Sequence, residues 1–501
     1  MCYIKDESLT WPESISGRAV SGGIWVIFLR TIEKLLNIIR LIILARILLP
    51  SDFGLLGIAL LTLDALLNFS ESGFMQALIQ KEGSIDSYLD SAWSFLVIRG
   101  LLLFTLLYIF APYLAGLFKI PEAVQVIRAI GLSVIFQGFS NIAVVRFKKD
   151  LTFNKYFAYQ LSGTIADFAI ALIFTFIFKN VWALVFGVLA RDFTRLISSY
   201  LIHSYRPRFN LSARKLKELF GFGKWVLSSS ILGFLISHSD DIIVARILGA
   251  ISLGFYQMAY KISNIPTSEI THIISHITLP AYSKLQKDVK RLKEAYLRVL
   301  RVTAIMAFPV AGFIIIFAKD FTAICLGQKW MPMVIPMQIL TLSGMIRSIA
   351  ATSGTVFLAT GKPRIDTLWQ VVRLAVLLIA AIPFILIWGT IGAAYAVLLS
   401  IFVSNIGFCF QCMKIIECPA VLFLKITGFI LAAATGSMVL ALFVRNITAP
   451  GTLSIVSSFF TALFVYSSII FLFGRHFGFT VKNILGSTFP GFAHIFTTFK
   501  K

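Results

Sequence analysis

Five polar residues on the first long apolar run of this chain have the types and the spacing to hold an anion. They fall within about 120° of one face when the run is drawn as a helix at about 100° per residue, and they are Arg30, Glu33, Lys34, Asn37 and Arg40. Each charge at the centre of a bilayer costs about 2.5 kcal/mol or more, so this face should point toward a polar interior. We predict that Arg30, Lys34 and Arg40 bind substrate and that Glu33 acts in coupling or gating.

A second polar stripe follows one face of the next apolar run. Asp64, Asn68 and Glu71 are spaced i, i+4, i+7, and we predict coupling or gating roles for Asp64 and Glu71. The positions 200 residues later continue the pattern with Asn264, Ser268 and Thr271, and Lys261 extends it. Lys261 is therefore predicted to contact substrate.

Further charges interrupt other apolar runs. We assign Arg191, Arg347 and Arg373 to substrate binding, and Asp240, Asp241 and Glu269 to coupling or gating. For any one of these residues, a buried ion pair between helices explains the charge as well as substrate contact does. Together, the excess of cations favours an anionic cargo, and the planar guanidinium suits phosphate oxygens.

Metal-binding residue types occur, but their spacing is incomplete. His272 and His276 resemble half of a zinc site or a proton relay, yet imidazoles hydrogen-bonded inside a helix bundle explain them more simply. The motif CFQC at 409–412 and Cys418 lack a further thiol or imidazole nearby. We expect no metal, no cofactor and no catalytic residue.

Membrane helices must position these charges. The chain of 501 residues is 58% hydrophobic and 14% charged, with a mean hydropathy of +0.87, so polar side chains are too few to cover a water-soluble protein of this length. Apolar runs of about 20 residues, enough to cross a hydrocarbon core of about 30 Å, occur about fourteen times. They lie near residues 18–48, 53–80, 89–112, 122–146, 155–178, 181–204, 219–248, 252–282, 295–318, 332–360, 366–387, 389–413, 420–443 and 452–474. The first run does not resemble a cleavable signal peptide.

The net charge of +22 reflects topology, and no nucleic-acid partner is expected. Most lysines and arginines between the runs fall in alternate loops, and the opposite set of loops holds only Lys119, Lys179, Lys319, Lys329 and Arg445. This positive-inside bias predicts a multi-pass protein of the inner, or cytoplasmic, membrane with both termini in the cytoplasm.

An internal repeat organises the spans. LARILLPSDFG at 44–54 matches VARILGAISLG at 244–254 in the ARIL letters and the final glycine, and an even number of spans lies between them. The repeat is therefore parallel, with an axis along the membrane normal. We predict two lobes of about six helices each, at 14–205 and 217–415, around a central cavity. Two extra helices at 420–474 and a cytoplasmic or interfacial tail at 475–501 follow, and Arg40 corresponds to Asp240 where the repeats diverge.

Longer stretches carry a family resemblance. The segment LARILLPSDFGLLGIALLTLDALLNFSESGF resembles the opening of prokaryotic polysaccharide exporters of the multidrug/oligosaccharidyl-lipid/polysaccharide flippase superfamily. The segments VARILGAISLGFYQMAYKISNIP, LPAYSKLQKDVKRLKEAYLRVLR and LGQKWMPMVIPMQIL are similar to the colanic-acid-exporter branch of the Wzx-type flippases. The resemblance covers about residues 14–415.

The resemblance implies a transporter that flips an undecaprenyl-diphosphate-linked oligosaccharide by alternating access. It implies as partners the lipid-linked oligosaccharide, membrane lipids, a proton or sodium ion for coupling, and polysaccharide assembly proteins. A cation-coupled multidrug exporter of the same superfamily is the nearest alternative, although the arginine excess argues against cationic drugs. A membrane polysaccharide polymerase or ligase is a weaker alternative, because the longest predicted outer loop, 318–331, has no nucleophile and base pair.

Overall fold

The computed structural model of this chain describes residues 13–264, 278–447 and 452–474, and these residues form helices joined by short turns and loops. Nine of the described helices are long and apolar enough to cross a membrane, or up to ten if one bent pair counts as a span. The structure thus agrees with an all-helical membrane protein, while the count of about fourteen spans stays a prediction. The chain divides into unit 1, Met1–His238 with Gly249–Gly254, and unit 2, Ser239–Leu248 with Phe255–Lys501.

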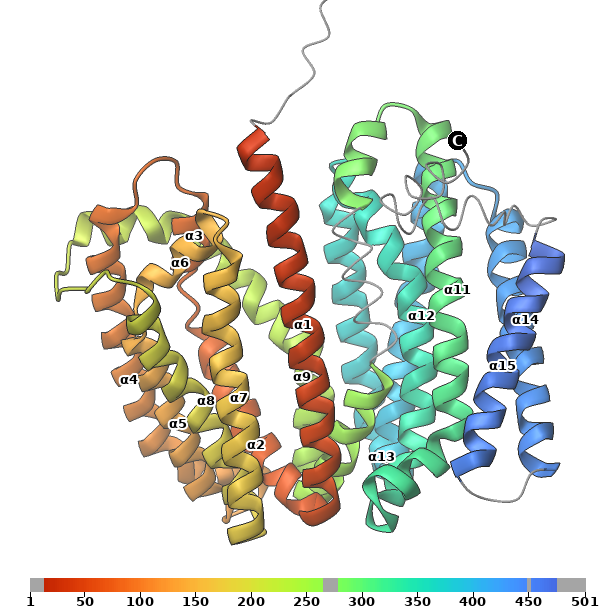
Figure 1. Cartoon of the computed structure of the whole chain (residues 1–501), viewed down its shortest axis with the longest axis horizontal. Helices are drawn as coiled ribbons and strands as arrows, with labels where there is room; N and C mark the ends of the chain where they lie inside the picture. Colours follow the sequence, from red (N-terminus) through yellow and green to blue (C-terminus); the bar gives the residue numbers. More distant parts are fainter. Residues whose placement is uncertain (1–12, 265–277, 448–451, 475–501) are drawn as a thin grey trace, which may run out of the picture. The chain divides into compact units, whose positions relative to one another are not determined.

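Unit 1 is a bundle of long helices with two short helices at one end (Figure 1). Its long helices are α1 (Glu13–Ile47), α2 (Pro50–Phe69), α4 (Asp86–Phe118), α5 (Ala123–Phe139), α7 (Phe153–Phe178) and α8 (Val181–Ile202). The short helices α3 (Phe74–Gln80) and α6 (Val145–Lys149) lie side by side. Helix α7 packs against α8 and α1, and α5 packs against α4, α8 and α2.

Unit 2 is a second bundle of long helices (Figure 1). It contains α11 (Val289–Phe321), the short π-helix η2 (Thr322–Leu326), the short 3₁₀-helix η3 (Gln328–Met333), α12 (Val334–Ala359), α13 (Pro363–Ile415), α14 (Ala420–Ile447) and α15 (Thr452–Phe473). One of its core clusters includes the fully buried Tyr296 and Phe357. Helix α9 (Ala213–Ser263) contributes residues to both units.

Glycines break the helices where the sequence separates two apolar runs. Gly249 interrupts α9 with φ of 81°, between the runs predicted at 219–248 and 252–282. Gly389 interrupts α13 with φ of 59°, at the first residue of the run predicted at 389–413, which follows the run at 366–387. Positive φ carries no steric penalty for glycine, which explains why the breaks fall at these positions.

The two copies of the repeated segment contact each other reciprocally within unit 1. A Cβ atom on Gly54 would lie 1.7 Å from the carbonyl oxygen of Ala250, and one on Gly254 would lie 2.1 Å from the carbonyl oxygen of Pro50. Positions 50 and 54 therefore meet their own counterparts, 250 and 254, crosswise, which is the contact pattern of a two-fold relation. Glycine is needed at both positions because backbone presses on backbone.

We expect Gly54→Ala to destabilise the protein by about 3 kcal/mol or more, since a backbone carbonyl must move to make room. The control is Gly436→Ala on α14, where an added Cβ meets nothing within 4 Å and better helix propensity should be neutral to slightly stabilising. Thermal unfolding of the detergent-solubilised variants measures both effects. Equal unfolding temperatures for the two variants would contradict the close approach.

Candidate functional site

Two apolar runs that the sequence presents as continuous are broken in the structure, and the breaks enclose a cavity. The run predicted at 53–80 separates into α2 and α3 at Ser70–Gly73. The run predicted at 122–146 bends by 73° between α5 and the segment Ile142–Lys149. Discontinuous helices at membrane depth are a common way to build polar binding sites, because the freed backbone groups need a polar interior.

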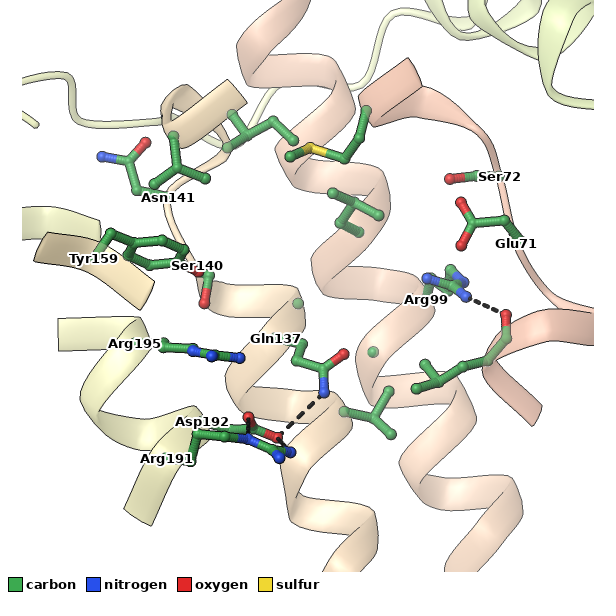
Figure 2. Close-up of a pocket in the computed structure, with 18 residues that line it drawn as sticks. Glu71, Ser72, Arg99, Gln137, Ser140, Asn141, Tyr159, Arg191, Asp192 and Arg195 are labelled. Atoms are coloured by element: carbon green, nitrogen blue, oxygen red, sulfur yellow. Dashed lines mark hydrogen bonds and ion pairs between the residues drawn. The ribbon is translucent and has the colours of Figure 1, made fainter. Parts of the chain in front are cut away.

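The cavity between these breaks has a volume of about 390 Å³ and lies within unit 1 (Figure 2). Its polar lining comes from α4, α5, α7, α8 and the two breaks: Glu71, Ser72, Arg99, Gln137, Ser140, Asn141, Tyr159, Arg191, Asp192 and Arg195. Helices α4 and α5 approach closely here, since a Cβ on Gly138 would lie 2.8 Å from the carbonyl oxygen of Leu96. The site is thus bordered by closely packed helices and lined by charges.

Asn141 holds the second break together. It is fully buried, and its side chain accepts a hydrogen bond from the backbone N–H of Ala143 (3.0 Å) and donates one to the carbonyl of Tyr205 (2.7 Å). Its own N–H donates to the hydroxyl of Ser199 (2.9 Å). These bonds satisfy backbone hydrogen-bonding groups that the interrupted helix leaves unpaired. The fold therefore holds the break at Ser140–Asn141, which lines the cavity, in one conformation.

Tyr205 belongs to an extended strap, residues 203–212, that joins α8 to α9 along α4. Its hydroxyl donates to Asp90 (2.6 Å), which also accepts from the N–H of Arg208 (2.8 Å). Burial raises the pKa of Tyr205, and the hydrogen bond to Asp90 raises it further, so the hydroxyl stays protonated and remains a donor. The strap therefore holds the carbonyl that anchors Asn141.

One wall of the cavity carries two arginines from α8 (Figure 2). Nε of Arg191 donates to Asp192 (2.9 Å), and Asp192, which is 4% exposed, also accepts from Gln137 (3.2 Å). Arg195 lies one turn further on, against Gly163, where an added Cβ would be 2.7 Å from its Nε. That Nε is buried and has no hydrogen-bond partner among the described residues. Its N–H is therefore available to donate a hydrogen bond to a bound ligand.

The opposite wall carries Arg99 and Glu71 (Figure 2). Arg99 donates to the carbonyl of Leu67 (3.0 Å) and to the hydroxyl of Ser70 (2.8 Å), and it interacts electrostatically with Glu71. Glu71 accepts a hydrogen bond from the N–H of Gly73 (2.9 Å). Arg99 and Glu71 thus stabilise the first break and present charge to the cavity.

A second charged group lies next to the cavity, between α1, α7 and α8. Arg40 pairs with Asp167 at 2.8 Å, and the two side chains are 16% and 6% exposed. One turn away Thr164 donates to Glu33 (3.2 Å). Both members of the Arg40–Asp167 pair also interact electrostatically with Arg191, so this pair adjoins the cavity wall.

Unit 2 contains its own polar cluster. Tyr256, fully buried, donates to Asp240 (2.6 Å), and Arg347 donates to the hydroxyl of Tyr260 (3.2 Å) and to Asn264. Arg373 interacts electrostatically with Asp240, Tyr260 and Arg347. The structure therefore brings Asp240, Arg347 and Arg373 together. Coupling or gating by Asp240 and substrate binding by the two arginines stay predictions.

The remaining predicted site residues lie elsewhere. Arg30 is exposed on α1 and Lys34 is partly exposed, and neither lines the cavity. Lys261 is exposed, and Asp241 is partly buried beside Asp240. Asp64 on α2 interacts electrostatically with Arg191 and His238 in unit 1. Glu269, His272 and His276 lie outside the described residues. The roles predicted for all of these residues stay predictions.

Several lining residues were not assigned to the site from the sequence: Arg99, Gln137, Asn141, Tyr159 and Arg195. The signal that could have found them is the interruption of two apolar runs by small and polar residues, FSESG at 69–73 and GFSN at 138–141. Such interruptions mark discontinuous membrane helices and hence binding sites.

The fold and the site define a multi-pass helical membrane protein of the transporter type, with a charged cavity formed at broken helices. A solved structure of the lipid II flippase MurJ in an inward closed conformation has the same fold, with a TM-score of 0.74 at 16% identity, covering 91% of this chain and 99% of that one. An inward-facing MATE family multidrug transporter matches with a TM-score of 0.61 at 17% identity, over 77% of this chain and 95% of that one.

The family follows from the sequence comparison. The family described as polysaccharide biosynthesis protein matches residues 43–335, more than half of the chain, and the chain belongs to this family. It is similar to the lipopolysaccharide biosynthesis protein WzxC of Escherichia coli K12, with 24% identity over 78% of this chain and 80% of that protein. It is also similar to the teichuronic acid biosynthesis protein TuaB of Bacillus subtilis 168, with 26% identity over 60% of this chain and 62% of that protein.

Proposed function

We propose that this protein flips a polyprenyl-diphosphate-linked oligosaccharide, with undecaprenyl as the lipid, from the cytoplasmic to the outer leaflet by alternating access. Membership of the polysaccharide biosynthesis family and the fold shared with the lipid II flippase MurJ support this class of cargo. A relative named succinoglycan biosynthesis transport protein ExoT, 24% identical over 63% of this chain, adds to that support. The protein then acts in assembly of a surface polysaccharide and is a transporter rather than an enzyme.

The observation that carries the proposal is the cavity at the two helix breaks. Its arginines, Arg99, Arg191 and Arg195, outnumber its carboxylates, Glu71 and Asp192. Guanidinium groups at membrane depth suit the oxygens of a diphosphate, and Gln137, Asn141 and Tyr159 offer the hydrogen bonds and the aromatic face that sugars use. Three cationic residues of α1 add to the electrostatic attraction of the phosphates: Arg30, Lys34 and Arg40.

The finer architecture belongs to this proposal. We place two lobes at 14–205 and 217–415 with two further helices at 420–474 and a tail at 475–501, about fourteen spans in all, in the inner membrane with both termini in the cytoplasm. The two predicted lobes alternate access to a central cavity, as the parallel repeat in the sequence predicts. Arg347, Arg373 and Lys261 contact substrate, whereas Asp64, Asp240, Asp241 and Glu269 take part in coupling to a proton or sodium ion. Polysaccharide assembly proteins are the expected protein partners.

A multidrug exporter is the second candidate, because the MATE transporter fold matches and Glu71 and Asp192 are acidic. Proteoliposomes separate the two functions. We expect the wild type to move a polyprenyl-diphosphate oligosaccharide between leaflets, scored by a glycan-cleaving enzyme added outside, and not to move a cationic dye. Dye transport without movement of the glycolipid would contradict the proposed cargo and favour the multidrug exporter.

Arg40→Ala is expected to reduce glycolipid movement at least about tenfold, the effect of losing about 1.4 kcal/mol of binding. Expression and thermal stability of the variant serve as the folding control. Unchanged transport by a folded Arg40→Ala protein would remove Arg40 from the substrate site.

A further inference from the structure

The strap and the first turns of α9 carry exposed side chains that the proposed transport does not use. They lie at the end of unit 1 that also carries α3 and α6 (Figure 1). Residues 203–218 hold five cations and one carboxylate: Arg206, Arg208, Arg214, Lys215, Lys217 and Glu218. Two apolar side chains among these cations, Phe209 and Leu211, are 63% and 47% exposed. Cations mixed with exposed apolar side chains are typical of segments that lie in a membrane interface.

The backbone of the strap is bound to the first turns of α4. The N–H of Arg208 donates to Asp90 (2.8 Å), and the N–H of Asn210 donates to the hydroxyl of Ser94 (2.9 Å). Tyr205 turns the other way and packs against an apolar core cluster of unit 1. The exposed side chains of the strap are therefore held outward before any ligand arrives, so binding costs little ordering.

The strap lies where lipid headgroups are expected. Helix α4 has 33 residues and is about 50 Å long, whereas a hydrocarbon core is about 30 Å thick. Residues 100–118 of α4 contain no charged side chain and are long enough to cross that core, and the strap is bound to the turns before them. At the same level Trp93 and Tyr200 both donate to the carbonyl of Phe139 (3.4 and 2.8 Å). Tryptophan and tyrosine are enriched at the headgroup level of membrane proteins.

Apolar and cationic side chains of the strap lie at different depths along α4. The residue between Phe209 and Leu211 is bound at Ser94, one turn closer to the apolar stretch of α4 than Asp90, where Arg208 is bound. The apolar side chains are thus on the hydrocarbon side of Arg208. A phospholipid has the same order, with its phosphate above its acyl chains.

The guanidinium groups of this surface have donors available for a phosphate. In the part of the chain that the structure describes, Arg208 makes its hydrogen bond through its backbone N–H and none through its guanidinium. Arg214 is 93% exposed and lies 3.9 Å from Glu218, a weak contact at an exposed site. Glu218 already accepts from Tyr88 in the first turn of α4 (2.6 Å) and pairs with Lys81 (3.6 Å). Both arginines can therefore offer their planar donor groups to phosphate oxygens.

We infer that the strap and the first turn of α9 form a binding site for an anionic phospholipid of the bilayer. Arg208 and Arg214 bind the headgroup phosphate, and Phe209 and Leu211 pack on the upper part of the acyl chains. The occupant is a bilayer lipid rather than an acidic protein, because the apolar side chains lie on the hydrocarbon side of the cations. The excess of cations selects an anionic lipid over a zwitterionic one. The inference does not depend on the proposed function.

Photo-crosslinking of the full-length protein tests this site. A benzophenone amino acid replaces Phe209 in vesicles that contain phosphatidylglycerol and phosphatidylcholine at equal mole fractions, with one lipid radiolabelled at a time. We expect labelling by phosphatidylglycerol to exceed labelling by phosphatidylcholine at least about fivefold, the preference that about one cation near the surface provides. The matched control places the benzophenone at Phe176 on α7 of the same unit, which is 64% exposed, and the two lipids should label it about equally.

The double variant Arg208→Gln with Arg214→Gln should bring the ratio at position 209 close to one. Glutamine keeps the backbone N–H that Asp90 accepts, so the strap stays in place while its charge is lost. Arg128→Gln, on α5 of the same unit, should leave the ratio unchanged. Raising the salt concentration to about 1 M, where the screening length falls to about 3 Å, should also lower the ratio and does not require the double variant to fold.

Three results would overturn the inference. Equal labelling of position 209 by the two lipids would show no anionic preference. A preference that survives both the double variant and high salt would assign the anionic lipid to other residues. Suppression of the phosphatidylglycerol label by trace amounts of unlabelled polyprenyl-diphosphate oligosaccharide would identify the occupant as the proposed cargo instead of a bilayer lipid.

Discussion

Arg191→Gln should lower the free energy of unfolding by about 2 kcal/mol and abolish glycolipid transport. The substitution leaves the carboxylate of Asp192, 4% exposed, with Gln137 but without its cation, and an unpaired buried charge is costly. It also removes a guanidinium from the wall of the cavity. Denaturation of the solubilised protein and flipping in proteoliposomes measure the two losses separately.

The double variant Arg191→Gln with Asp192→Asn separates these two effects. Neutralising both partners removes the buried charge, so most of the lost stability should return. Transport should not return, because the phosphate-binding cation is still missing. If transport recovers together with stability, Arg191 is a structural partner of Asp192 and does not contact the substrate.

Arg195→Gln should reduce transport by about a hundredfold and leave stability within about 0.5 kcal/mol of the wild type. Its Nε has no hydrogen-bond partner among the described residues, so the folded protein gains little from that donor. Two charge-assisted hydrogen bonds to a phosphate are each worth about 1.5 kcal/mol, which gives the expected loss. Flipping assays and thermal unfolding on one preparation test the prediction.

Arg128→Gln is the matched control for Arg195→Gln. Arg128 belongs to α5 of the same unit, where it lies over the ring of Tyr108 and does not line the cavity. Its replacement should leave transport near the wild-type level. Equal transport by the two variants would remove Arg195 from the binding site.

The fold class could be predicted from the sequence because hydrophobic length is a strong signal in a membrane. The breaks at Gly249 and Gly389 also fall at boundaries of predicted runs, since glycine adopts those angles without strain. The breaks at Ser70–Gly73 and Ser140–Asn141 were not predicted, because serine and asparagine also occur inside continuous helices. Their effect depends on partners far away in the sequence, such as Tyr205 for Asn141.

The candidate site was predictable in part for the same reason. Charged residues within apolar runs identify polar interiors, and Arg40 and Arg191 do lie together in unit 1. That Arg40 pairs with Asp167 could not be read from the sequence, since the two residues are more than a hundred positions apart. From the excess of cations we expected arginines available to bind an anion, whereas the structure shows Arg40 and Arg191 in ion pairs with carboxylates.

Photo-crosslinking tests most directly whether the cavity of unit 1 holds the head group of a lipid-linked sugar. A benzophenone amino acid would replace Tyr159, which lines the cavity, or Tyr113 on α4, which is 72% exposed and outside it. With a radiolabelled polyprenyl-diphosphate oligosaccharide, we expect a labelled product at position 159 that excess unlabelled glycolipid suppresses, and little at position 113. Labelling at position 113 alone, or equal unsuppressed labelling at both positions, would contradict the proposal that this cavity binds the cargo.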